Sequence, residues 1–168
     1  AFRGKVLLIA RLSLSRIGPG QPARFQEATR MPAIPLRAMV LCANPGRLLR
    51  YGALFNRCGY FHLSLCLDRR ELRRSLDQGY PYDYCLYDGF RLDQGCKGTL
   101  AMLGRSGSIR RFLLVGELDC REKRLLFEWS RGHGLSIGAV SDRPLGQVAL
   151  AALIKRDRGC PDLLRGIA

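Results

Sequence analysis

The feature that most constrains this chain is a regular alternation, from about residue 38 onward, of short apolar runs with longer segments of helical pattern. Most of the runs do not alternate strictly between apolar and polar residues, which is typical of strands covered on both faces. Five strands, each followed by a helix, predict an α/β fold with one doubly wound, five-stranded parallel sheet and helices on both faces. The runs span residues 38–42, 61–67, 82–87, 112–115 and 135–140.

Capping and turn residues set the expected helix boundaries. Asp68 can cap the second helix, and Asp119 with Glu122 three residues later forms a variant capping box for the fourth. Pro45 and Pro144 occupy positions typical of a first helical turn. The third segment is Gly-rich and only weakly marked. The predicted helices run from Pro45 to Cys58, over 69–78, over 95–104, from Asp119 to Gly132, and from Pro144 to about residue 153.

The length of 168 residues suits one domain, and the charge is unevenly spread along it. The 28 Lys and Arg against 14 Asp and Glu give a net charge of +14, a balance typical of proteins that bind nucleic acid, an anionic membrane or an acidic partner. Residues 1–36 are predicted to be a basic, disordered arm, with an organellar transit peptide as the alternative. The folded domain is expected over 37–155, and residues 156–168 as a tail or truncated linker.

Cysteine usage and hydropathy indicate the compartment. The longest aliphatic run, 148–154, is far shorter than the roughly 20 residues of a membrane span, so no span is expected. The seven cysteines include no C-x-x-C pair, so neither a disulfide framework nor a zinc site is predicted. Cys42, Cys66 and Cys85 lie in apolar runs and are expected to be buried thiols. A cytoplasmic protein is therefore predicted.

The positions directly after the strands are the first candidates for functional residues, because doubly wound folds place their sites at the carboxyl ends of the strands. These positions are 42–45, 88, 116–117 and 142–144. Asp88 ends the apolar run Tyr-Asp-Tyr-Cys-Leu-Tyr-Asp-Gly at 82–89 and would lie at the mouth of the sheet. An aspartate in this place can also serve only as a turn former or a helix cap.

The order of elements and these positions resemble the receiver domains of bacterial two-component response regulators, over about residues 37–155. The run YDYCLYDG is similar to the strand that ends in the phosphoacceptor aspartate, and VLCANP to the segment that usually ends in a pair of acids. HGLSIGAVSDRPL is similar to the fifth strand and Lys-Pro turn, above all in receivers attached to EAL-type cyclic-di-GMP phosphodiesterases. The resemblance implies a flavodoxin-like (βα)5 receiver fold, with Asp88 as the phosphoacceptor equivalent and Arg143 as the equivalent of the family lysine.

The remaining positions of the receiver motif have lost their chemistry. Cys42 and Ala43 stand where the resemblance implies the acid pair, Gly116 where it implies a hydroxyl, and Val140 where it implies an aromatic switch residue. Because Mg²⁺ prefers carboxylate oxygens to thiolates, no metal and no other cofactor are expected. The guanidinium of Arg143 is expected to clasp Asp88 as a fixed ion pair.

These losses favour a non-catalytic regulatory module of bacterial signal transduction, a pseudo-receiver that binds proteins without Mg²⁺-dependent phosphorylation. Its partner would be a histidine kinase, a cyclic-di-GMP phosphodiesterase, another signalling protein or a second copy of the chain. One alternative is a working receiver, phosphorylated on Asp88 by a histidine kinase with the help of Mg²⁺. Another is a nucleic-acid-binding protein that uses the basic arm and the arginines at 69–74. No Ser/His/Asp or Cys/His arrangement marks a nucleophile, so an enzyme is not expected.

The resemblance also implies a partner-binding face, formed by the fourth helix, the fifth strand and the fifth helix. Trp129 is more typical of a core anchor than of this face, because it shares a helical stripe with Leu125 and Leu126. His62 and His133 have no ligands at metal spacing and are expected to be structural or surface residues. The candidate interface residues are Arg121, Lys123, Arg124, Glu128, Gln147 and Ala151.

Overall fold

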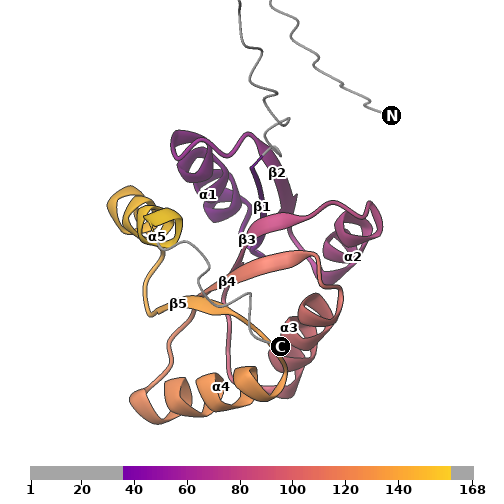
Figure 1. Cartoon of the computed structure of the whole chain (residues 1–168), viewed down its shortest axis with the longest axis vertical. Helices are drawn as coiled ribbons and strands as arrows, with labels where there is room; N and C mark the ends of the chain where they lie inside the picture. Colours follow the sequence, from indigo (N-terminus) through magenta and orange to yellow (C-terminus); the bar gives the residue numbers. More distant parts are fainter. Residues whose placement is uncertain (1–35, 160–168) are drawn as a thin grey trace, which may run out of the picture. The chain divides into compact units, whose positions relative to one another are not determined.

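The computed structural model describes residues 36–159, which form five strands and five helices in strict alternation (Figure 1). The predicted arm, apart from Leu36, and the end of the predicted tail lie outside these residues. The strands are β1 (Arg37–Leu41), β2 (His62–Cys66), β3 (Tyr82–Asp88), β4 (Ile109–Val115) and β5 (Ile137–Ser141). The helices are α1 (Pro45–Arg57), α2 (Arg69–Asp77), α3 (Gln94–Arg105), α4 (Cys120–Gly132) and α5 (Gln147–Gly159).

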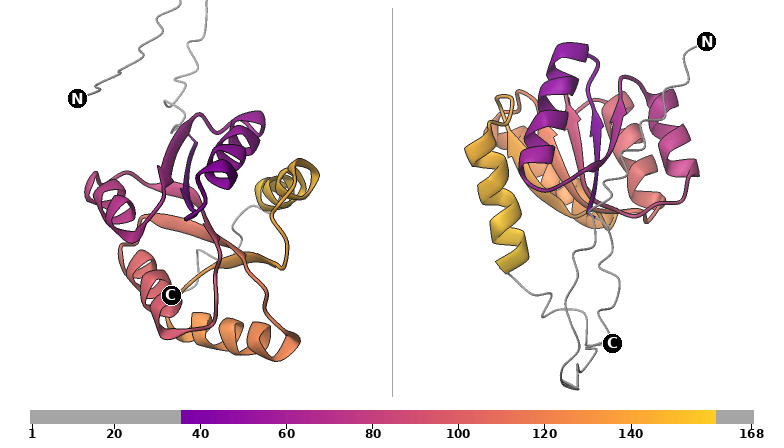
Figure 2. Two further views of the ribbon diagram at one scale, coloured as in Figure 1. Left: turned by 180° about the vertical axis from the view of Figure 1, so that it is seen from behind. Right: turned by 90° about the horizontal axis from the view of Figure 1, so that it is seen from above.

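The five strands form one parallel sheet in the order β2-β1-β3-β4-β5. Helices α1 and α5 cover one face, and α2, α3 and α4 cover the other, as the two views of Figure 2 show. This is the flavodoxin-like (βα)5 arrangement, so the predicted fold class is confirmed. In such a sheet the strand order reverses between β1 and β3, and their carboxyl ends flank the crevice where doubly wound folds bind ligands.

The central strands owe their continuous apolar runs to burial on both faces. In β1, Met39 packs against the side covered by α2, α3 and α4, and its neighbour Val40 packs against the side of α1 and α5. The same alternation places Cys85 and Leu86 of β3 in the two opposite cores. The edge strands β2 and β5 are only partly buried, so the expectation of cover on both faces holds for the centre of the sheet.

The predicted caps are present. The Asp68 side chain accepts hydrogen bonds from the backbone N–H groups of Arg70 and Glu71, at 2.7 and 2.9 Å. Asp119 and Glu122 each accept from the backbone N–H of the other, at 2.7 and 2.9 Å, which completes the capping box of α4. Both sets satisfy N–H groups that have no partner inside the helix.

The last helix begins and ends later than predicted. It starts at Gln147, because Gly146 disfavours helical backbone and Leu145 is buried against the core from a loop. Pro144 therefore precedes the helix rather than opening it. The helix also continues past the expected boundary at residue 155 to Gly159.

A polar contact at the amino end of the sheet fixes this helix. Asp157 of α5 is buried, accepts a hydrogen bond of 2.8 Å from the Tyr84 hydroxyl and forms an ion pair with Arg111 of β4. β4 begins at Ile109, three residues before the predicted run, and so includes Arg111. Because Asp157 compensates the charge of Arg111, this arginine can lie within the strand. We call Tyr84, Arg111 and Asp157 the α5 anchor.

The cysteines and the helix lengths can be compared with the predictions of buried thiols and of no membrane span. Cys42, Cys66 and Cys85 are buried and free, as predicted. Within residues 36–159, every helix is too short or too polar to cross a lipid bilayer.

Candidate functional site

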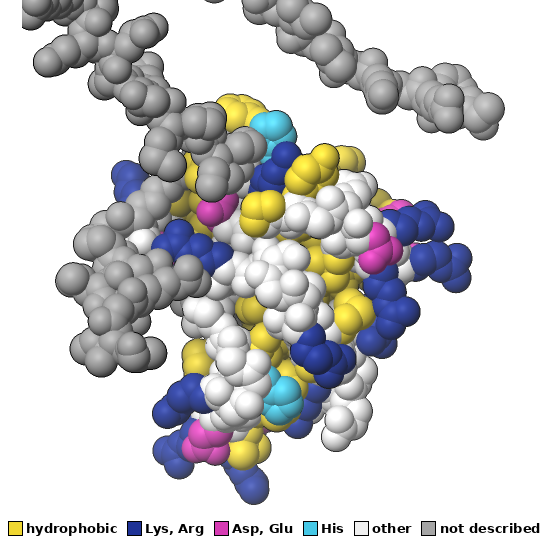
Figure 3. Space-filling view, turned by 45° about the vertical axis from the view of Figure 1, so that its right-hand side comes forward, with side chains coloured by type: hydrophobic (Ala, Val, Ile, Leu, Met, Phe, Trp, Pro, Cys, Tyr) yellow, Lys and Arg dark blue, Asp and Glu magenta, His cyan; other side chains and the backbone are white. Residues whose placement is uncertain are grey.

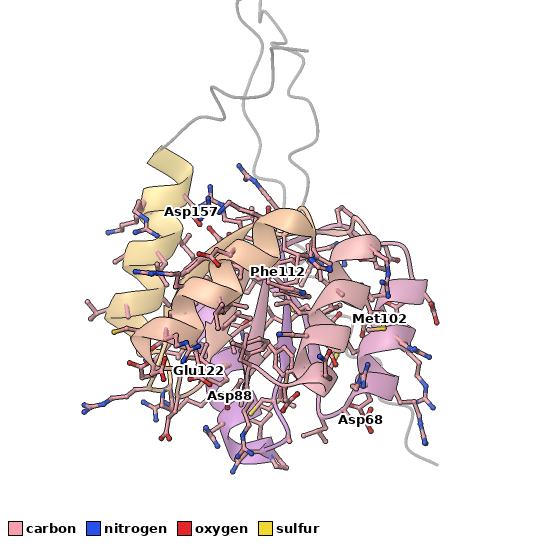
Figure 4. The ribbon with its side chains drawn as sticks, turned by 90° about the horizontal axis from the view of Figure 1, so that it is seen from below. Asp68, Asp88, Met102, Phe112, Glu122 and Asp157 are labelled. Atoms are coloured by element: carbon pink, nitrogen blue, oxygen red, sulfur yellow. The ribbon has the colours of Figure 1, made fainter. Side chains whose placement is uncertain are left out.

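Asp88 is the last residue of β3 and lies at the carboxyl end of the sheet, as predicted. Cys42 directly follows β1, and the two side chains meet in the crevice between these neighbouring strands. The residue Asp88 is only 7% exposed. Figure 4 shows it near Glu122 and at the opposite end of the sheet from Asp157.

Two side chains hold the Asp88 carboxylate. The Cys42 thiol donates a hydrogen bond to Oδ2 at 2.9 Å. Nη1 of Arg47 lies 3.3 Å from Oδ1 and 3.2 Å from Oδ2, so its charge faces both oxygens. The Asp88 side chain is 2% exposed and that of Arg47 is 48% exposed, so the cation closes the carboxylate off while its own outer side stays in solvent.

The predicted ion pair between Asp88 and Arg143 is wrong. Arg143 is exposed, and its backbone N–H donates to the Ser141 hydroxyl at 3.4 Å, while Arg47 supplies the guanidinium at Asp88. The position of Arg47 in the sequence indicates that it needs an anionic partner. A cation in the first turn of a helix opposes the positive end of the helix dipole, and at a crevice beside an aspartate such a residue calls for an anionic partner.

The thiol at the acid-pair position is a proton donor. Burial and the hydrogen bond to Asp88 raise the pKa of Cys42 from 9.0 to about 11. Burial also raises the pKa of the nearby Tyr51 to about 12, with a smaller contribution from the charge of Asp88. Both groups therefore stay neutral around the carboxylate at physiological pH, and Arg47 supplies the compensating charge.

Two neighbouring acidic residues, Glu122 and Asp142, are engaged elsewhere. Ala43 is exposed and offers no ligand atom on its side chain. Glu122 caps α4, and Asp142 pairs with Lys123 at 2.8 Å. Within residues 36–159 no group of three or more His, Cys, Asp or Glu side chains is arranged to hold a metal ion. The donor set around Asp88, a thiol and a guanidinium, does not suit Mg²⁺.

Gly116, at the position of the expected hydroxyl, is enclosed by the loop that follows β3. A Cβ atom added there would lie 1.9 Å from the carbonyl oxygen of Phe90. That loop is held in place by the Phe90 N–H, which donates to the Val115 carbonyl at 2.9 Å, and by the buried Phe90 ring, which packs edge-on against Tyr87. A serine or threonine at 116 would require this loop to move.

The switch position on β5 holds no aromatic ring. Val140 is partly buried and packs against the core on the side of α2, α3 and α4.

An open pocket of about 540 Å³ lies beside Asp88 and Gly116 at the mouth of the sheet. Its lining mixes both charge signs and includes Arg47, Asp88, Arg91, Glu117, Glu122 and Asp142.

The candidate interface residues fall into two groups. Arg121, Arg124 and Glu128 are exposed on α4. Lys123 is committed to Asp142, and on α5 the Gln147 side chain accepts a 2.9 Å hydrogen bond from Arg57 while Ala151 is half-buried.

The side chains of Trp129 and of the two histidines are partly or fully exposed. Trp129 is half-buried against the core, as expected, but Leu125 of its predicted stripe is 46% exposed. The Trp129 ring stacks on His133, with ring centres 4.3 Å apart. His62 and His133 are both exposed.

Two solved structures share this fold. One, named as a pilus assembly-related protein of Burkholderia pseudomallei, superposes with a TM-score of 0.57 and 21% sequence identity, over 74% of this chain and 90% of that chain. The other, named as the pilus assembly protein CpaE of Burkholderia thailandensis, superposes with a TM-score of 0.54 and 21% identity, over 74% of this chain and 99% of that chain. No protein-family model and no curated protein sequence matches the chain. At this identity the likeness establishes the shared fold.

Proposed function

We propose that this protein is a regulatory, protein-binding module with a degenerate receiver fold that works without phosphorylation of Asp88. The observation that carries the proposal is the closed environment of the Asp88 carboxylate, which is held by the Cys42 thiol and the Arg47 guanidinium. A receiver needs a divalent cation at this place to offset the charge of the incoming phosphoryl group. Here a fixed side-chain cation already neutralises the carboxylate.

The residues around Asp88 support the same proposal. In-line phosphoryl transfer needs a carboxylate oxygen that an incoming phosphorus atom can approach. Oδ2 of Asp88 accepts the thiol hydrogen bond, and both oxygens face Arg47. The contact of Gly116 with the Phe90 carbonyl leaves no space for the hydroxyl that would hold the transferred group.

The solved structures of the same fold suggest where to look for partners. Both are named for pilus assembly. We therefore include that process in the proposal, and proteins of pilus assembly are the first partners to test.

The test uses beryllofluoride with Mg²⁺, which mimics an aspartyl phosphate. The proposal expects the thermal midpoint of the full chain to stay unchanged on adding the mimic, and acetyl phosphate to add no mass of a phosphoryl group. A matched variant, Asp88→Ala, reports any effect of the reagents that does not involve this carboxylate.

The working receiver is the outcome that would overturn the proposal. In that case the mimic raises the midpoint of the wild type, and Asp88→Ala abolishes the rise. A second variant, Cys42→Asp with Ala43→Asp, restores the acid pair and shows whether the missing ligands are what prevents binding of the mimic.

A further inference from the structure

Helix α2 carries four arginines, at 69, 70, 73 and 74, and all four side chains are exposed. Residues 69 and 73, and likewise 70 and 74, are four positions apart, so the guanidinium groups stand in two adjacent rows on the solvent side of the helix. Figure 3, which turns the right-hand side of Figure 1 forward, shows Lys and Arg side chains gathered on that flank. We call these four residues the α2 arginine face.

The four arginines of this face repel one another, although the Asp68 carboxylate at the helix cap attracts Arg70 and Arg74. None of its members forms an ion pair with a carboxylate among residues 36–159. Like charges four residues apart repel, and Arg69 and Arg70 also sit at the positive end of the helix dipole. The helix has nine residues with Leu72 as its buried anchor, and its Asp68 cap offsets part of this repulsion. An anionic partner would remove the repulsion on binding.

A groove of about 400 Å³ lies beside the arginine face, between α2 and the end of α3, and is lined by Arg73, Leu76, Asp77, Met102, Ser106 and Ser108. Leu76 of α2 and Met102 of α3 are half-buried in it, and Arg73 reaches across to donate from Nε to the Met102 sulfur at 3.4 Å. Asp77 stands at the carboxyl end of α2. Along α2 the arginines therefore come first, Leu76 next and Asp77 last, while Ser106 and Ser108 make the other side of the groove partly polar.

We propose that the α2 arginine face and the α2–α3 groove together bind an acidic, amphipathic segment of a partner protein. A leucine or methionine of the segment would sit against Leu76 and Met102, where a flexible thioether adapts to the side chain it meets. The carboxylates of the segment would lie toward Arg69, Arg70, Arg73 and Arg74, and away from Asp77. The charge pattern thus fixes one direction for the bound segment.

The surroundings favour a protein over a nucleic acid or a membrane. The groove offers no aromatic ring on which a base could stack. The apolar side of α2 is buried in the protein core, so the helix has no free apolar face for insertion into a lipid layer. Apolar groups beside cations match a peptide that presents leucine and glutamate on one side.

The test measures binding of a synthetic peptide to the full chain by fluorescence anisotropy, without Mg²⁺ or any phosphoryl donor. The probe is a 12-residue peptide with two leucines four positions apart and four flanking glutamates. A peptide of the same composition with the leucines dispersed controls for net charge. A 20-base-pair DNA duplex and phosphatidylglycerol vesicles serve as the other anionic probes.

Two matched variants locate the binding surface. Arg70→Gln with Arg74→Gln removes two charges from the α2 arginine face, and Arg50→Gln with Lys155→Gln removes two exposed charges from α1 and α5, on the other face of the sheet. We expect the α2 variant to weaken peptide binding about tenfold, as two lost surface ion pairs predict, and the control variant less than about twofold. Amide shifts on binding should appear over 69–76 and 102–108, and the dispersed peptide should bind more weakly.

Three results would overturn the inference: no binding of the peptide, equal losses in the two variants, or tighter binding of the duplex or the vesicles through the same arginines. The inference rests on the proposed role as a protein-binding module, but the two can fail separately. The peptide assay contains no phosphoryl group, and the beryllofluoride assay contains no peptide. A failure in one therefore leaves the other result standing.

Discussion

The two ends of the sheet hold similar arrangements of side chains in different surroundings. At the carboxyl end, Asp88 meets an arginine and a thiol, and at the amino end Asp157 meets an arginine and a tyrosine hydroxyl. The first aspartate borders an open pocket of about 540 Å³, and the second a small cavity of about 80 Å³. The arginine side chain is 48% exposed at the carboxyl end and 26% at the amino end.

The difference shows that a buried, paired aspartate does not by itself indicate a functional site. The α5 anchor joins a helix to two strands, so its pairing is structural. The Asp88 pair joins the first turn of α1 to the end of β3 and faces the crevice where this fold binds ligands. Position in the fold, more than the chemistry of the pair, separates the two roles.

The largest effect is expected from breaking the α5 anchor. Asp157→Asn leaves the Arg111 charge without its partner and should lower the free energy of unfolding by about 3 kcal/mol, the low end for a buried pair because Arg111 is partly exposed. Urea unfolding measures the change, with the exposed Asp77→Asn as control. Replacing both charged partners, Asp157→Leu with Arg111→Met, should recover part of the loss, because the buried Tyr84 hydroxyl still lacks its acceptor. A loss no greater than that of the control would mean that α5 is held by its apolar contacts alone.

The next effect concerns the thiol at the carboxyl end. Because the pKa of Cys42 is raised from 9.0 to about 11, its reaction with iodoacetamide at pH 8 should be slower in the folded protein than in urea. Two pKa units reduce the thiolate fraction, and so the rate, about a hundredfold. Mass spectrometry of the Cys42 peptide gives both rates. Equal rates in the two states would contradict the buried hydrogen bond to Asp88.

The same shift has an equilibrium consequence. The unfolded chain releases the Cys42 proton from about pH 9, whereas the folded protein keeps it to about pH 11. The free energy of unfolding should therefore be unaffected by this thiol below pH 9 and should fall between pH 9 and 11. Cys42→Ala should show a shallower fall, measured by urea unfolding at each pH. An unchanged slope would exclude Cys42 as a source.

The loop over Gly116 gives a third way to sharpen the comparison. Gly116→Ala places a methyl group against the Phe90 carbonyl and should cost about 2 kcal/mol of stability. Gly98→Ala is the matched control, because Gly98 lies inside α3 with no atom within 4 Å of an added Cβ, and it should be neutral or slightly stabilising. Thermal unfolding compares the two. If both alanines behave alike, the loop is free to move and the proposed exclusion of a hydroxyl fails.

The smallest effect is expected from the exposed half of the Asp88 pair. Arg47→Gln should lower stability by about 1 kcal/mol, since the Arg47 side chain is half-exposed and its shortening opens the Asp88 carboxylate to water. Arg143→Gln should change nothing measurable, because Arg143 does not contact Asp88. An equal or larger loss for Arg143→Gln would restore the pairing expected from the sequence.

The sequence predicted the parts of this structure that depend on local pattern and burial. The central strands stand out because both of their faces are buried, and Asp88 stands out because an acid ends such a run. The caps at Asp68 and Asp119 are local in the chain and were also predictable.

The contacts between distant segments were not predictable in the same way. Which arginine reaches Asp88 depends on how α1 is oriented over the sheet, and a motif comparison favoured Arg143 over Arg47. The start of β4 was not predicted, because a charged Arg111 is untypical of a buried strand. The residue that compensates its charge, Asp157, lies 46 positions later in the chain. The enclosure of Gly116 depends on the path of a loop that no periodicity describes.

The contact between Gly116 and Phe90 also bears on how freely the two positions can change. Any side chain at position 116 would meet the Phe90 carbonyl, so a larger residue there requires a different path of the loop that follows β3. Because the buried Phe90 ring and its N–H bond to Val115 fix that path, the loop cannot move without losing both contacts. Position 116 and the loop are therefore coupled, and substitutions in one should be tolerated only together with changes in the other.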